Sequence, residues 1–269
     1  MKRWILWIFL GIFSLLFLVS SCILGTYCFT SLRQQQASHT LAQIMHESAA
    51  PQETTASIQE TAPQPEQTDT PEATEVPGML PEFTALYAMN PDIVGWITIP
   101  GTRIDYPVMQ TPEQPDYYLS RGFDKAYSRH GCIYVREECD VAAPSDNLTI
   151  YGHRMGDGTM FNDLHKYLDA DFCRENPSIF FTTLTQRRTY EILAVFAIAS
   201  DASSDFPYHL FVDAAEEVDF DAYIAQCNAR ALYDTGVTAS YGDKLITLST
   251  CEYTQENGRL VVVARSIDE

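Results

Sequence analysis

The 269-residue chain has few basic residues and lacks the short motifs of several large enzyme classes. Its 17 Lys and Arg against 36 Asp and Glu give a net charge of −19, which argues against nucleic acid as the main partner. No Cys-x-x-Cys or His-x-x-x-His pair occurs, so we expect neither a metal site nor another cofactor. Gly-x-Ser-x-Gly and Gly-x-x-x-x-Gly-Lys are absent too, which argues against a serine hydrolase of that type and a phosphate-binding loop.

Charge is absent altogether from residues 4–32, which are dominated by Ile, Leu, Phe, Val and Trp. About 20 apolar residues cross a bilayer, and this run is longer than the core of a signal peptide, so it predicts a membrane anchor. Lys2 and Arg3 precede it, which places the N-terminus in the cytoplasm and the rest outside the cell. The stretch "VSSC", ending at Cys22, resembles a lipoprotein cleavage box and leaves a cleaved or lipidated signal open. Apolar sequence continues beyond Cys22, which favours the uncleaved anchor.

Basic residues are also missing from 47–77, where seven acidic residues accompany many Pro, Thr, Gln and Ala. Such a segment buries too little apolar surface to offset the chain entropy lost on ordering. We therefore expect an extended tether over 34–79, with a short helix over 34–45. The predicted organisation is a cytoplasmic tip and anchor at 1–33, the tether, and one globular domain at 80–269.

The globular part contains eight stretches rich in β-branched and aromatic residues, separated by turn residues, which predict strands. These stretches are 94–99, 104–108, 132–135, 148–151, 179–183, 190–199, 244–250 and 260–265. Apolar residues at helical spacing predict a helix over 220–231, and a shorter one is expected over 160–168. A mostly β domain with a few helices indicates a barrel or closed sheet, as opposed to a doubly wound fold.

The last two predicted strands enclose a cysteine and an arginine, in "TLSTCEYTQENGRLVVVAR". With "EYTQENG" as the turn, Cys251 lies where the first strand ends and Arg259 where the second begins. A thiol and a guanidinium would then meet at one end of the sheet. Arg265 shares a face with Arg259 but lies about 20 Å further along the strand. The alternative is a small core residue and a surface charge.

A thiol becomes a strong nucleophile beside a base, so Cys251 needs a histidine. His39 and His46 precede the globular domain, and His165 and His209 lie among apolar and aromatic neighbours, where structural roles are usual. His153 follows a predicted strand directly, in "IYGHRMGDGTMF". Glycines there allow the close approach of a substrate backbone. His153 is therefore the candidate base, with a simple turn residue as the alternative.

A rival thiol lies in "SRHGCIY", where His130 and Cys132 resemble the Ser-His-Gly-Cys signature of L,D-transpeptidases. That family carries a further histidine upstream and an Asn or Arg after the cysteine, and both are missing here. Cys139 has acidic neighbours that disfavour a thiolate. Cys173 has no evident partner, and Cys227 belongs to the apolar face of the predicted helix. Seven cysteines is an odd number, so at least one is not paired within the chain.

Three segments together resemble the sortases. They are "TLSTC", "YGHRMGDGTMF" and "NPDIVGWITIPGTRIDYPVMQ", of which the second and third are similar to the class B form. The resemblance extends over 80–266. It implies an eight-stranded sortase-type β-barrel behind a transmembrane helix. It also implies a cysteine transpeptidase that cleaves a C-terminal sorting signal of secreted proteins after Thr and passes the protein, through a thioester, to an amine. The acceptor would be a peptidoglycan precursor or a pilin lysine.

The resemblance also implies residue roles. Cys251 would be the nucleophile, His153 the acid and base, and Arg259 the group that holds the substrate carbonyl or oxyanion. Ser249 and Thr250 would bind substrate.

The segment 205–234 corresponds to a helical insertion of class B domains and is expected to form one wall of the substrate groove. A tethered surface domain without catalysis, or an L,D-transpeptidase-like enzyme using Cys132, are the alternatives.

Overall fold

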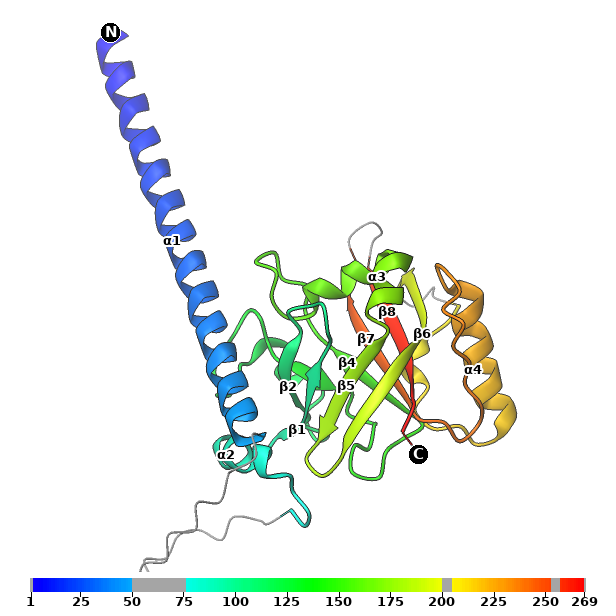
Figure 1. Cartoon of the computed structure of the whole chain (residues 1–269). Helices are drawn as coiled ribbons and strands as arrows, with labels where there is room; N and C mark the ends of the chain where they lie inside the picture. The colour runs from blue at the N-terminus through cyan, green and yellow to red at the C-terminus, as the bar shows by residue number, and fades with distance from the viewer. Residues whose placement is uncertain (1, 50–75, 200–204, 253–256, 269) are drawn as a thin grey trace, which may run out of the picture. The chain divides into compact units, whose positions relative to one another are not determined.

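The computed structural model describes most of the chain in two compact units, 1–40 and 41–269 (Figure 1). The described residues are 2–49, 76–199, 205–252 and 257–268.

A single long helix, α1 (Lys2–Ala49), begins the chain and makes up the described part of the first unit. The described large apolar side chains between Trp4 and Leu32 are exposed, and by length and composition the helix could cross a membrane. The short helix expected over 34–45 is confirmed as part of α1, and the prediction of an extended tether is wrong for 46–49, because the helix continues to Ala49. The rest of the predicted tether, up to residue 75, lies outside the described residues.

The second unit is built on a closed barrel of eight strands in the order β1-β2-β3-β4-β7-β8-β6-β5 (Figure 1). The strands are β1 (Ile93–Thr98), β2 (Asp105–Met109), β3 (Ile133–Val135), β4 (Asn147–Tyr151), β5 (Ser178–Thr183), β6 (Arg187–Ala199), β7 (Leu245–Cys251) and β8 (Gly258–Ser266). Two neighbouring pairs, β2 with β3 and β4 with β7, are parallel. All eight predicted strands are confirmed, and their ends differ by a few residues.

Short helices connect the strands. They are η1 (Pro81–Phe83), α2 (Thr84–Met89), η2 (Tyr117–Ser120), η3 (Phe161–Leu168), α3 (Ala170–Glu175), η4 (Tyr208–Leu210) and α4 (Glu217–Arg230). The predicted helix over 220–231 is α4, which starts with a capping box of Glu216 and Asp219. The predicted helix over 160–168 is a 3-10 helix, η3.

The central strand β7 is buried on both faces, which explains its unbroken apolar and small-residue sequence. Ile246 and Leu248 point into the barrel interior. On the other face, Leu245 packs with Phe220 and Tyr223 of α4. Because side chains alternate along a strand, Ser249 and Cys251 lie on the face of Leu245. The nucleophile candidate therefore emerges on the α4 side of the sheet, at the strand end.

Residues 41–49 of α1 belong to the second unit and pack on it. Leu41 and Met45 are buried in a cluster with Trp96 and other apolar residues. Nε2 of His46 lies 2.8 Å from Oδ2 of Asp105, whose other oxygen accepts a hydrogen bond of 2.7 Å from Nε1 of Trp96. The end of the helix is thus an integral part of the folded domain.

Candidate active site

Strand pairing alone brings the three predicted catalytic residues together. β7 lies between β4, which runs parallel to it, and β8, which runs antiparallel. Tyr151 of β4 pairs with Ser249 of β7, so His153 and Cys251 both lie two residues beyond the same pair. Arg259 pairs directly with Cys251. The predicted positions at the end of β7 and the beginning of β8 are confirmed.

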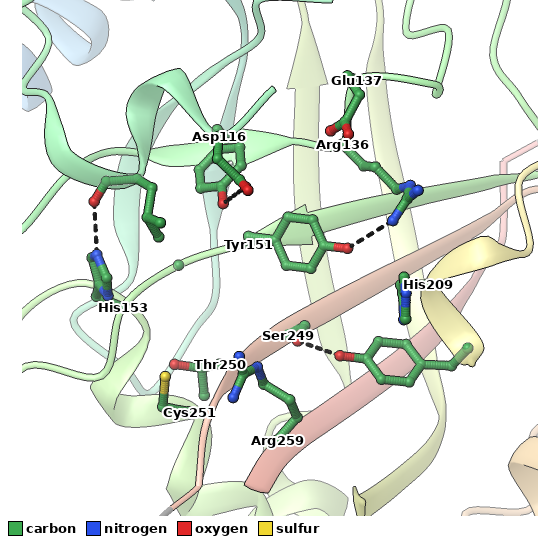
Figure 2. A pocket seen from close by; sticks show the side chains of 14 residues that line it. Asp116, Arg136, Glu137, Tyr151, His153, His209, Ser249, Thr250, Cys251 and Arg259 are labelled. Atoms are coloured by element: carbon green, nitrogen blue, oxygen red, sulfur yellow. Dashed lines mark hydrogen bonds between the residues drawn. The ribbon is translucent and has the colours of Figure 1, made fainter. Parts of the chain in front are cut away.

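The three side chains line one pocket of about 280 Å³ (Figure 2). Its lining also includes residues from the 116–119 segment, from β3 and β4, from η4 and from the end of β7. The complete lining is Asp116, Leu119, Tyr134, Arg136, Glu137, Tyr151, Gly152, His153, Tyr208, His209, Ser249, Thr250, Cys251 and Arg259. A cleft of this size, lined by both polar and apolar groups and containing the Cys251 thiol, can hold part of an extended peptide.

His153 is held by its surroundings on both sides. Its Nε2 donates a hydrogen bond of 2.7 Å to the backbone carbonyl oxygen of Leu119, and its own carbonyl accepts 2.9 Å from the amide of Phe161. A Cβ on Gly152 would meet Ile133 at 2.5 Å and Phe161 at 2.6 Å. The protein itself therefore fills the side on which a Cβ would project, while Gly152 also lines the pocket. That glycines here let a substrate backbone approach stays a prediction.

Cys251 is half-buried and Arg259 lies beside it across the ladder. Nη1 of Arg259 donates 3.1 Å to the carbonyl of Gly258, which leaves the remaining guanidinium donors for the pocket. Arg265 pairs with Leu245 at the far end of β7, as the spacing predicts. The turn between the strands includes 253–256, which lie outside the described residues.

Ser249 and Thr250, the predicted substrate-binding residues, both line the pocket. The Ser249 hydroxyl lies 2.7 Å from the buried hydroxyl of Tyr208, and burial raises the pKa of that tyrosine. Oγ1 of Thr250 is buried and has no hydrogen-bond partner among the described residues. A buried hydroxyl without a partner is unusual, and it lies next to the nucleophile in sequence.

The other side of the pocket contains groups that the sequence interpretation missed. Nη2 of Arg136 donates 2.8 Å to Glu138, and its Nη1 donates 3.5 Å to the Tyr151 hydroxyl. His209, assigned a structural role, lines the pocket instead. Burial, and then the charge of Arg136, lower its pKa. Its aromatic neighbours in "FPYHLF" hid it, because they suggest a core position.

The prediction for the 205–234 segment is half right. The 3-10 turn η4 contributes Tyr208 and His209 to the wall, but none of the lining residues comes from α4. This helix packs against β6 instead. It therefore supports the wall from behind.

The rival thiols are poor nucleophiles. Cys132 is buried, which raises its pKa, and His130 bonds to Asp157 at 2.8 Å. Burial likewise raises the pKa of Cys139 to about 11. All seven cysteines are free, and of the five outside α1 only Cys251 is not buried. Thiolate chemistry therefore favours Cys251.

A closed eight-stranded barrel with thiol, imidazole and guanidinium around one pocket is the arrangement expected of a cysteine transpeptidase. Residues 97–267 match the sortase domain, which is more than half of the chain. The chain therefore belongs to the sortase family and is a cysteine transpeptidase.

Its relatives place it in class B. It is 36% identical to sortase B of Listeria monocytogenes, over 69% of this chain and 74% of that protein. It is 29% identical to sortase B of Staphylococcus aureus, over 70% and 75%. Among solved structures, sortase B of B. anthracis in complex with AAEK1 is 28% identical, with a TM-score of 0.70 over 90% of this chain and 99% of that one.

Proposed function

We propose that this sortase is anchored in the membrane by α1 and cleaves a C-terminal sorting signal of secreted proteins after Thr. It then transfers the protein to an amine, either of a peptidoglycan precursor or of a pilin lysine. One observation carries the proposal: Cys251 and Arg259 pair across β7 and β8, and His153 lines the same pocket.

In the first half of the reaction, the Cys251 thiolate attacks the carbonyl carbon of the Thr. The carbonyl oxygen becomes an oxyanion, which the planar fork of Arg259 stabilises with charged donors. The C–N bond then breaks, and His153 gives its proton to the departing amine. The products of this half are a thioester on Cys251 and the released C-terminal peptide.

In the second half, the acceptor amine attacks the thioester carbonyl, and neutral His153 takes the proton that the amine loses. The C–S bond breaks and returns the Cys251 thiolate, while the new amide links the protein to its acceptor. Arg259 stabilises the second oxyanion in the same place. Each half therefore uses His153 once, first as acid and then as base.

Ser249 and Thr250 are proposed to bind the sorting signal. Ser249 shares the pocket face of β7 with the nucleophile, and its hydroxyl is fixed by Tyr208. Thr250 offers a buried hydroxyl that has no partner among the described residues. A substrate hydrogen bond would satisfy that group.

The membrane placement rests on α1, with the N-terminus in the cytoplasm and the barrel outside the cell. A helix of this length and hydropathy suits a bilayer span. The basic residues Lys2 and Arg3 support the orientation.

The full chain in detergent, mixed with fluorogenic peptides of the Asn-Pro-x-Thr and Leu-Pro-x-Thr types, tests the reaction. We expect cleavage after Thr and, by mass spectrometry, an acyl adduct on Cys251. Triglycine and Nα-acetyl-lysine as acceptors distinguish the two amine classes by their ligated products. If none of the peptides is cleaved, the proposal is contradicted and a domain without this activity is favoured. An acyl adduct on another residue would contradict the role of Cys251.

A further inference from the structure

The segment "SRHGC" contributes no residue to the proposed reaction, yet two of its residues lie against groups close to His153. His130 contacts Asp157, and Gly131 lies against the Leu119 carbonyl. His130 and Asp157 form a buried pair, 2.8 Å apart, with side-chain exposures of 7% and 10%. Asp157 lies in the loop that follows His153, and its Oδ1 also accepts the amide and hydroxyl of Thr159 at 3.1 and 2.7 Å. His130 belongs to a different segment, between η2 and β3. The pair therefore fastens the His153 loop to that segment.

Gly131, the next residue, packs directly on the group that His153 contacts. It has a φ of +59°, and a Cβ there would lie 2.6 Å from the carbonyl oxygens of Leu119 and Tyr118. The amide of Cys132 also donates 2.9 Å to Tyr118. Gly131 therefore packs against the Leu119 carbonyl, and any residue with a Cβ at this position would displace the backbone of Tyr118 and Leu119.

The contact between His153 and Leu119 also fixes a tautomer. A carbonyl oxygen only accepts hydrogen bonds, so Nε2 of His153 must carry a proton and donate. The nitrogen that gains and loses a proton in the reaction is then Nδ1. In a serine-protease triad the orienting partner is a carboxylate on Nδ1 and the reactive nitrogen is Nε2. Here the partner is a backbone carbonyl and the two nitrogens exchange roles.

We propose that His130, Gly131 and Asp157 form a positioning unit for His153: they hold the Leu119 carbonyl so that it keeps Nε2 protonated and leaves Nδ1 for proton transfer. None of these three residues lines the pocket that contains Cys251. The positioning unit rests on the role proposed for His153.

Asp157→Asn and Gly131→Ala test the unit in the full chain in detergent. We expect kcat for peptide cleavage to fall about 10- to 100-fold, because small displacements of a catalytic group have effects of this size. KM should stay within about twofold of the wild-type value, because none of the three residues lines the pocket. Asp157→Asn keeps the side-chain shape and carries the test if Gly131→Ala does not fold.

Matched variants separate positioning from stability. Asp163→Asn removes another buried carboxylate from an ion pair: Asp163 is 4% exposed, and its partner Arg103 is 60% exposed. Gly122→Ala changes a glycine of the same segment that is close only to a flexible side chain. Both should keep kcat near that of the wild type, even where the melting temperature falls.

The ring nitrogens of His153 give a readout independent of turnover. In the chain labelled with ¹⁵N-histidine, with signals assigned by His153→Gln, we expect the neutral ring to be protonated at Nε2. Asp157→Asn should convert part of it to the Nδ1-protonated form. An unchanged tautomer, or an unchanged kcat, in Asp157→Asn would overturn the proposal. If the wild type cleaves no sorting-signal peptide, the proposed function fails, while this measurement still decides the positioning unit.

Discussion

At the scale of single residues, burial distinguishes the reactive thiol from the others: Cys251 is half-buried, and the other four cysteines of the domain are buried. Cys251→Ala should abolish cleavage of every sorting-signal peptide, because no other thiol reaches the pocket. Cys132→Ala is the matched control, since Cys132 is buried and burial raises its pKa. We expect it to keep a substantial fraction of the activity. Peptide cleavage by both variants is the measurement, and loss of activity in Cys132→Ala alone would restore the L,D-transpeptidase alternative.

The domain that contains Arg259 carries a net negative charge. Three of the 17 basic and seven of the 36 acidic residues precede residue 78, which leaves 14 and 29, or a net charge of −15. Negative charge in general disfavours a thiolate, so we propose that the guanidinium of Arg259 opposes this charge in addition to holding the oxyanion.

Arg259→Lys keeps the charge and loses the planar fork. We expect kcat/KM for cleavage to fall about 100-fold, as for removal of an oxyanion donor, with a much smaller change in the rate of Cys251 alkylation at neutral pH. The two rates are measured on the same preparation. Equal losses in both would show that Arg259 acts on the thiol only, and unchanged cleavage would remove it from the catalytic set.

Asp163 gives the domain a predictable acid sensitivity. Burial raises the pKa of this carboxyl, but hydrogen bonds from the side chain and amide of Arg103 and from Lys166 outweigh it and hold the pKa well below its usual value. A depressed pKa in the folded state stabilises above the unfolded value of about 3.9, and that stability is lost as the pH falls below it.

Thermal melts between pH 2 and 7 test this. The stability advantage of the wild type over Asp163→Asn should be full above about pH 5 and shrink progressively below it. Asp171→Asn, which breaks an exposed pair with Arg174, should have little effect at any pH. A constant gap between wild type and Asp163→Asn would contradict the assignment.

The residues that the sequence interpretation found and missed differ in one respect. Cys251, His153 and Arg259 lie at strand ends, so the pattern of strands was enough to place them. Tyr208 and His209 come from a 3-10 turn whose path over β7 depends on α4 packing behind it. No local pattern encodes that packing, and the chemistry of those two residues was therefore not visible.

At the scale of elements, the clearest difference is the end of α1. Composition predicts a tether that begins with a short helix over 34–45, but it averages over Leu41, Met45 and His46 and so does not predict that this helix docks on the domain. In the structure Leu41 and Met45, one helical turn apart, pack in a cluster with Trp96, and Nε2 of His46 lies 2.8 Å from Asp105. A few well-spaced apolar residues are sufficient to dock a helix, although they do not change the mean hydropathy of a segment.

Residues 80–269 are still expected to fold, because they contain every strand. They should be less stable than 41–269, since burial of a Leu or Met side chain contributes about 1.5–3 kcal/mol each. Urea denaturation of the two fragments measures the difference. The double variant Leu41→Ala, Met45→Ala of 41–269 should lose most of this stability difference. The control Thr40→Ala, made in the full chain, should have the same stability as the wild-type full chain. Equal midpoints for the two fragments would contradict the docking.

At the scale of the whole molecule, the proposed orientation predicts what a protease can reach. In intact cells expressing the chain, protease added outside should digest the barrel and leave an epitope at the N-terminus intact. After lysis both should be digested. Loss of the N-terminal epitope in intact cells would reverse the orientation, and its absence from the mature protein would favour a cleaved signal.

The pairing of β4 with β7 has a consequence for when the enzyme becomes active. Thr247 and Asn147, which join these strands through a hydrogen bond of 2.7 Å, are 100 positions apart. Arg259 follows on the last strand of the barrel. During synthesis the chain has its imidazole long before its thiol and guanidinium. The pocket can therefore be complete only after the last strand of the barrel has been made.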